Sequence, residues 1–157
     1  MSEAVFRELE KVENIKEVIK NLFDVELDIS GGWGYNDESA VIINTLDMPM
    51  GQFMNLFATL RTNLEMNFDK DPDERYGGIN LSLQEEKNME NNGHRYDVAI
   101  FEISAMNEKK YAGFIKEYKE NYGKKTFDLN DHFSRRKEAV LTRVVECWFL
   151  QDREDAK

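Results

Sequence analysis

The stretch of sequence that decides the fold is residues 79–103, INLSLQEEKNMENNGHRYDVAIFEI. Apolar and polar residues alternate over 79–84, which is typical of a strand with one buried face. Residues 96–103 are apolar at both parities from Val98 onward, which predicts a second strand at the centre of a sheet. The residues between them include Asn91, Asn92 and Gly93, which tolerate positive φ and predict a turn. The whole segment is therefore a predicted antiparallel hairpin.

The sequence before this hairpin adds a second one, and helices are expected around both. Val25, Leu27 and Ile29 alternate with polar residues and predict a half-buried strand, which a glycine-rich turn joins to a short apolar strand at 40–44. Apolar side chains at helical spacing predict three helices, which end near Leu22, span 47–64 and span 107–122. Their expected N-terminal caps are Asn14, Asp47 and Asn107.

The last apolar segment, residues 139–150, has two possible interpretations. Its β-branched content favours a strand. In a strand, however, Arg143 and Glu146 would lie on opposite sides and leave no purely apolar face, so we predict a helix and keep the strand as the alternative. The element order is then α-β-β-α-β-β-α-α. This order predicts one α+β domain over residues 1–157, with an antiparallel sheet of about four strands and helices packed on it.

Composition and charge limit the function classes. The chain has 157 residues, one cysteine and two histidines, which exclude an internal disulfide and a Cys/His structural zinc site. The formal net charge is −10, and residues 1–107 carry 21 acidic against 9 basic side chains. A negative field repels phosphate groups, so nucleic acids and anionic membranes are poor partners, whereas a basic protein would be attracted. The same charge could instead serve solubility alone. We expect a soluble, cytoplasmic protein with no cofactor.

No catalytic or metal-binding motif is evident. His94 and His132 have no serine or cysteine nucleophile near them in sequence, so we expect ordinary surface histidines and no enzyme. Cys147 lies between apolar residues and is expected in the core. The acidic loop 69–74 begins like a calcium loop, but it has Glu74 where that loop needs glycine and Asn80 where it needs glutamate. A solvated turn is the interpretation that remains.

The least ordinary stretch is the glycine-rich turn, Gly31-Gly32-Trp33-Gly34-Tyr35. Its spacing is not that of a phosphate-binding loop. Exposed tryptophan and tyrosine beside acidic residues are typical of an interface anchor. The alternative is that Trp33 folds back and covers the sheet.

Residues 28–43, DISGGWGYNDESAVII, together with the size and acidity of the chain, resemble bacterial immunity proteins. These are the small cytosolic inhibitors that accompany the toxins of contact-dependent growth inhibition and related polymorphic toxin systems. The resemblance implies that the protein neutralises a cognate toxin, commonly a basic nuclease, by tight one-to-one binding. It assigns no functional residue, because the residues that contact the toxin differ between such families.

Our leading hypothesis is therefore a protein-binding inhibitor whose acidic surface occludes the active site of a basic toxin domain. The residues proposed to bind this partner are Trp33, Tyr35, Asp37, Glu38, Asp69, Asp71, Asp73 and Glu74. A second hypothesis is a ligand-sensing or regulatory module with a pocket between sheet and helices. A third, an enzyme that uses His94, is the weakest. Glu102 shares its strand face but lies eight residues away, roughly 26 Å along a strand.

Overall fold

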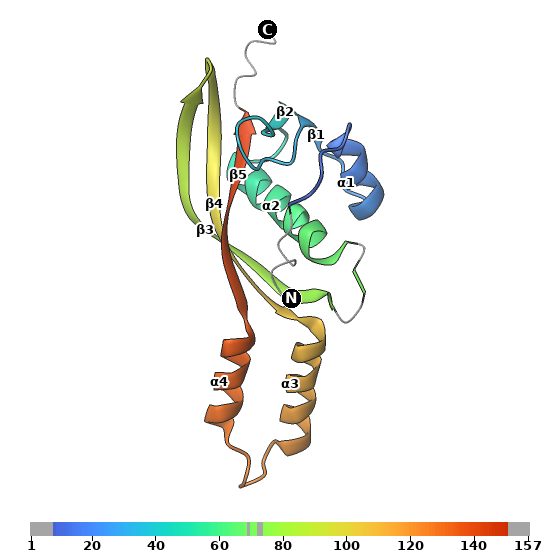
Figure 1. Ribbon diagram of the computed structural model, residues 1–157, viewed down its shortest axis with the longest axis vertical. Helices are drawn as coiled ribbons and strands as arrows, with labels where there is room; N and C mark the ends of the chain where they lie inside the picture. The colour runs from blue at the N-terminus through green and yellow to red at the C-terminus, as the bar shows by residue number, and fades with distance from the viewer. Residues whose placement is uncertain (1–7, 69, 72–73, 151–157) are drawn as a thin grey trace.

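The hairpin predicted from residues 79–103 forms the longest part of the sheet. The computed structural model describes residues 8–68, 70–71 and 74–150. In it, β3 (Tyr76–Asn91) pairs antiparallel with β4 (His94–Asn107), and both strands extend beyond the predicted ones. Asn92 and Gly93 form the turn with φ of 54° and 82°, as their tolerance of positive φ predicts. This hairpin projects beyond the rest of the sheet (Figure 1).

The described residues form a five-stranded sheet in the order β1-β2-β5-β4-β3, with β1 (Asp28–Gly31), β2 (Val41–Thr45) and β5 (Leu141–Leu150). The pairs β1–β2, β3–β4 and β4–β5 are antiparallel. The pair β2–β5 is parallel and short, with Val41 opposite Phe149 and Ile42 opposite Leu150. The predicted α+β class is confirmed, and the sheet is mixed and mostly antiparallel.

The helix predicted over 139–150 is wrong, because this segment is the strand β5 at the centre of the sheet. Cys147 and Phe149 are buried on one of its faces, and Trp148 is half-buried on the other. A central strand has no purely polar face. Arg143 lies on the same face as Cys147 and Phe149 but is exposed, and Glu146 lies exposed on the other face, so each face combines apolar residues with one charged residue. The last helix is α4 (Leu129–Ala139), which ends where the predicted one begins.

Helices α1 (Ile15–Phe23) and α2 (Met50–Asn67) cover one face of the sheet (Figure 1). Phe53 and Phe57 of α2 meet Phe149 edge to face, with ring centroids 5.6 and 5.7 Å apart. The predicted apolar stripe of α2 is therefore the centre of the core. Asn14 caps α1 through a hydrogen bond from the Glu17 amide, as predicted, whereas α2 begins after Pro49 without a side-chain cap from Asp47.

Helices α3 (Glu108–Asn121) and α4 form a hairpin that extends from the ends of β4 and β5, away from α1 and α2 (Figure 1). We call it the helical arm. Asn107 caps α3 as predicted, and its Oδ1 accepts from the amides of Lys109 and Lys110. His132 is fully buried between the two helices, so the expectation of a surface histidine is wrong. Within the described residues, no helix has the length and apolar character needed to cross a membrane.

Candidate protein-interaction surface

The glycine-rich turn lies directly against β5, and this contact requires its glycines. Trp148 donates its amide to the Gly34 carbonyl at 2.8 Å. A Cβ on Gly34 would stand 3.1 Å from the Trp148 carbonyl oxygen, and the φ of Gly34 is +88°. A Cβ on Gly32 would meet the Ser39 carbonyl oxygen at 2.5 Å. Larger side chains at these positions would displace the turn from the strand.

The two aromatic residues of the turn point inward. Trp33 is only 3% exposed, packs against Phe57, and donates from Nε1 to the Glu10 carbonyl at 3.1 Å. The structure thus has the alternative in which Trp33 folds back over the core. Tyr35 is half-buried, and its hydroxyl accepts from the Leu9 amide at 2.9 Å. Both side chains fasten the segment before α1 to the turn.

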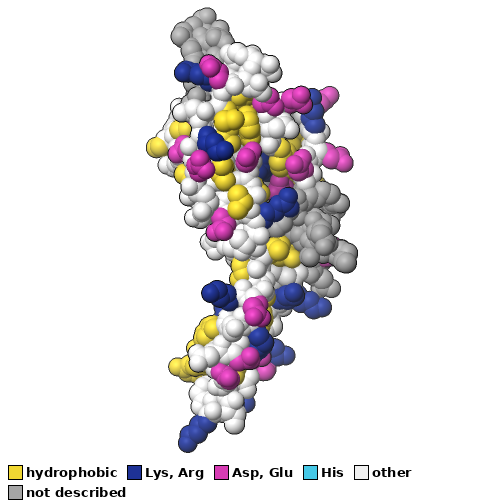
Figure 2. Space-filling model, turned by 60° about the vertical axis from the view of Figure 1, so that its left-hand side comes forward, with side chains coloured by type: hydrophobic (Ala, Val, Ile, Leu, Met, Phe, Trp, Pro, Cys, Tyr) yellow, Lys and Arg dark blue, Asp and Glu magenta, His cyan; other side chains and the backbone are white. Residues whose placement is uncertain are grey.

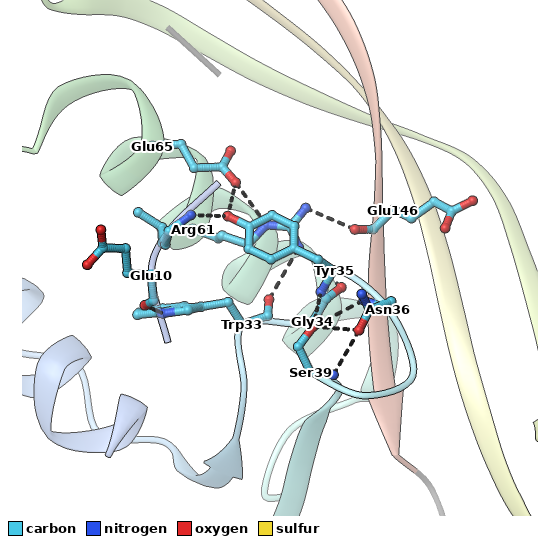
Figure 3. A network of polar contacts seen from close by, with 10 residues as sticks. Glu10, Trp33, Gly34, Tyr35, Asn36, Ser39, Arg61, Glu65 and Glu146 are labelled. Carbon is cyan, nitrogen blue, oxygen red and sulfur yellow. Dashed lines mark hydrogen bonds and ion pairs between the residues drawn. The ribbon is translucent and has the colours of Figure 1, made fainter. Parts of the chain in front are cut away.

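Arg61 of α2 is the centre of the polar network beneath this turn (Figure 3). Its side chain is 1% exposed, and one terminal nitrogen donates to the carbonyls of Trp33 and Gly34 at 3.2 Å each. The other terminal nitrogen donates to the Glu146 carbonyl of β5 at 2.9 Å. Since β2 pairs only with the last two residues of β5, Arg61 satisfies a strand carbonyl that β2 does not reach.

Glu65 and Tyr35 complete the network around the guanidinium. The Arg61 guanidinium lies 4.3 Å from the centre of the Tyr35 ring, and its Nε is 3.6 Å from Glu65 Oε2. The Tyr35 hydroxyl donates to the same carboxylate oxygen. Burial raises the pKa of Glu65, with Arg61 acting in the opposite direction. Burial likewise raises the pKa of Tyr35 far above its usual value. This arrangement holds the turn and β5 together.

The predicted acidic residues of the turn lie at the rim of a hollow. A hollow of about 600 Å³ separates the turn from the segment before α1. Asp37 and Glu38 line it together with Glu8, Glu13 and Lys11. Acidic side chains therefore outnumber basic ones around this hollow. Asp37 also accepts a hydrogen bond from the side chain of Asn91, at the tip of the β3–β4 hairpin.

The other predicted acidic residues are not brought to the same place. Asp71 and Glu74 are exposed in the loop that precedes β3, whereas Asp37 contacts Asn91 at the far end of that strand. At the rise of an extended chain, the two ends of β3 are on the order of 45 Å apart. The predicted residues outside the described part of the chain are Asp69 and Asp73. The acidic residues of the two loops therefore do not form one contiguous site.

The sheet has a second face, on which no described helix packs, and Figure 2 shows it. We call it the open face. Its side chains follow from the strand register and include Glu85, Lys87, Met89, Tyr96, Val98, Ile100, Glu102, Val144, Glu146, Trp148 and Leu150. Val144 is 59% and Met89 40% exposed, while Ile100, Trp148 and Leu150 are half-buried. Tyr96 and Val98 are only 6% and 2% exposed, so the accessible apolar surface of this face consists of Met89, Ile100, Val144, Trp148 and Leu150 on three strands.

Carboxylates surround the centre of the open face. Ile100 lies between Glu85 on β3 and Glu146 on β5, and Glu102 is the next residue of β4 on this face. Lys87 lies beside Glu85 on the same face. None of the three carboxylates is in an ion pair with another described residue. Their charge is therefore available to a positively charged partner.

Trp148 is the largest side chain of the open face. Its indole N–H donates to Glu146 Oε1 at 3.0 Å, and its ring meets Tyr96 edge to face at 5.6 Å. Both contacts fix its orientation before any partner arrives. A fixed tryptophan within an apolar patch, with charged groups around it, has the composition of a binding hot spot.

The open face was not predicted, although part of it is visible in the sequence. The parity of β4 separates Tyr96, Val98 and Ile100 from the residues that face the helices. Trp148 and Glu146 join them only when residues 141–150 form a strand. Because we predicted a helix there, the sequence analysis did not bring these residues together.

Potential reactive groups are few among the described residues. Cys147 is buried as predicted, and burial raises the pKa of its thiol to about 11. No group of three or more His, Cys, Asp or Glu side chains in this part of the chain could hold a metal ion. Comparison of the chain with protein-family models, with curated proteins and with solved structures finds no match in any of the three.

Proposed function

We propose that the protein is an acidic binding protein that docks a basic protein domain on its open face and blocks that domain's active site. The observation that carries this proposal is the uncovered apolar surface with carboxylates around Ile100. Binding would bury Trp148 and Val144 and pair the carboxylates with lysines or arginines of the partner. The resemblance of residues 28–43 to immunity proteins supports a toxin domain, such as a basic nuclease, as that partner.

The glycine-rich turn has an indirect part in this proposal. Trp33 and Arg61 are buried, so they hold β5 in position and do not contact the partner. Asp37 and Glu38 lie at the rim of the hollow beside the turn, where they add to the negative field. A field of this kind steers a basic partner toward the surface and raises its association rate by about 10- to 1000-fold.

Affinity capture from a lysate of the native strain, followed by purification of the captured protein, tests the proposal. We expect one basic protein, bound one to one and inhibited in its own activity. The variant E85K/E102K/E146K should lose both binding and inhibition. The matched control E86K/E90K/E120K changes the net charge equally at exposed positions outside the open face and should keep both. Equal binding by the two variants would contradict the proposed surface, and capture of no basic protein would contradict the proposed function.

A further inference from the structure

A groove of about 410 Å³ lies where the helical arm meets the sheet. Its floor is Ala105 and Met106 at the end of β4, both buried. Tyr111 of α3 and Phe133 of α4 stand on the arm side and are 48% and 49% exposed. Side chains this apolar and this exposed gain free energy when a ligand covers them. The volume lies within the range usual for small-molecule sites.

Two cations, Arg136 and Lys137, line the same groove. The Arg136 guanidinium lies over the Tyr111 and Phe133 rings, 5.8 and 5.4 Å from their centres. This stacking keeps the guanidinium beside the apolar walls without neutralising its charge.

The preceding residue of α4, Arg135, is in contrast held in ion pairs. It contacts Glu117 at 2.7 Å and Asp131 at 2.9 Å. Neither Arg136 nor Lys137 is in an ion pair with any residue that the structure describes. No carboxylate of the described residues lines the groove, although Glu108 lies against Gly77 at its edge. The lining of the groove is therefore positively charged, whereas the chain as a whole has a net charge of −10.

We propose that this groove binds a small amphipathic carboxylate. The apolar part of the ligand packs on Ala105 and Met106 between Tyr111 and Phe133. Its carboxylate accepts charge-assisted hydrogen bonds from Arg136 and Lys137. Gly78 borders the groove, and a Cβ there would meet no atom within 4 Å, so the wall on the β3 side is open to a ligand's chain. This inference goes beyond the proposed function and concerns the arm end of the sheet, where Ser104 lies two residues beyond Glu102 on β4.

Calorimetric titration of the full chain with decanoate tests the proposal. Decanoate should bind, and decyltrimethylammonium, which carries the opposite charge on the same chain, should not. The variant R136Q/K137Q should weaken decanoate binding by about tenfold or more, because it removes both charged donors. The control K124Q/K125Q removes the same charge at exposed positions in the turn of the arm and should bind like the wild type.

Methyl NMR of the seven methionines locates the ligand. Decanoate should shift the methyl signal of Met106 and leave that of Met54, a buried residue of α2, in place. The proposal is overturned if decanoate does not bind at millimolar concentration, if the cationic detergent binds equally well, or if Met106 does not respond. The assay contains no protein partner and no variant of the open face, so its failure and the failure of the proposed function are distinguishable.

Discussion

Arg61 is a buried cation whose partners are mainly backbone carbonyls. Its guanidinium joins three separate segments, namely α2, the glycine-rich turn and β5. The Gly34 carbonyl also accepts from the Trp148 amide, whereas no residue of β2 lies opposite Glu146, because β2 pairs with β5 only at Val41 and Ile42. The arginine side chain is long and planar enough to reach all of these carbonyls at once.

We therefore expect Arg61→Met to lower the free energy of unfolding by about 3–5 kcal/mol, since it removes the donor to the Trp33 and Glu146 carbonyls and leaves buried Glu65 without its cation. Urea unfolding followed by circular dichroism measures this. Arg95→Met, at an exposed position of β4, is the control and should stay within about 0.5 kcal/mol of the wild type. A loss below about 1 kcal/mol for the Arg61 variant would contradict the role assigned to the network.

Glu65 gives the same network a pH dependence. Burial raises the pKa of its carboxyl above the ordinary value of 4.5, so between these two pKa values the folded state binds more protons than the unfolded state. The contribution of this group is therefore complete below pH 4.5 and is lost as the pH rises through the folded-state pKa. We expect the stability of the wild type relative to Glu65→Gln to fall as the pH rises from 4.5 toward neutrality. Urea unfolding of both proteins across this range measures the difference in stability. A difference that stays constant or rises with pH would contradict the role assigned to Glu65.

At the scale of the element, β5 determines most of what the molecule presents. It joins the short β1–β2 pair to the long β3–β4 hairpin, and it carries buried side chains on one face and Trp148 on the other. The Trp148 amide points toward the glycine-rich turn, so the amides of neighbouring odd-numbered residues point toward β4.

Amide hydrogen exchange should show this alternation. We expect slow exchange at Val145 and Cys147, whose amides face β4, and faster exchange at Val144, which lies beyond the reach of the turn and of Arg61. A helix over the same residues would protect consecutive amides alike. Uniform protection from Val144 to Cys147 would therefore contradict the strand.

The sequence predicted the elements that have a regular pattern or a local cap. The β3–β4 turn, the Asn14 and Asn107 caps and the apolar stripe of α2 all depend on neighbouring residues alone. The strand β5 does not depend on local pattern alone, because one of its faces packs on distant α2 while the other keeps Val144 and Trp148 beside Glu146, so neither face is purely polar or purely apolar. Trp33 was equally ambiguous, since its burial depends on Phe57 and on the segment before α1.

At the scale of the whole molecule, the helical arm differs in charge from the rest of the chain, which we call the body. Residues 108–139 carry nine basic and six acidic side chains, a net charge of +3, against −10 for the chain. The negative field therefore arises from the body, where the open face lies. A basic partner would be guided to the body, whereas an anionic ligand would be attracted to the arm.

The open face predicts different kinetic roles for its charged and apolar residues. Steering acts at a distance and is screened by salt, whereas apolar contacts form only after docking. For the purified basic partner, we expect the association rate constant to fall by about tenfold or more between about 25 mM and about 300 mM salt. The variant E85K/E102K/E146K should associate slowly and with a weaker salt dependence.

Trp148→Ala should change the other rate constant. It removes a half-buried anchor without changing the charge, so we expect nearly wild-type association and dissociation at least tenfold faster, as for a residue that contributes about 1.4 kcal/mol or more. Leu22→Ala, at an exposed position of α1, is the control and should leave both rates unchanged. Surface plasmon resonance at several salt concentrations measures all four proteins. If Trp148→Ala slowed association and left dissociation unchanged, the open face would guide the partner without binding it, and the contact would lie elsewhere.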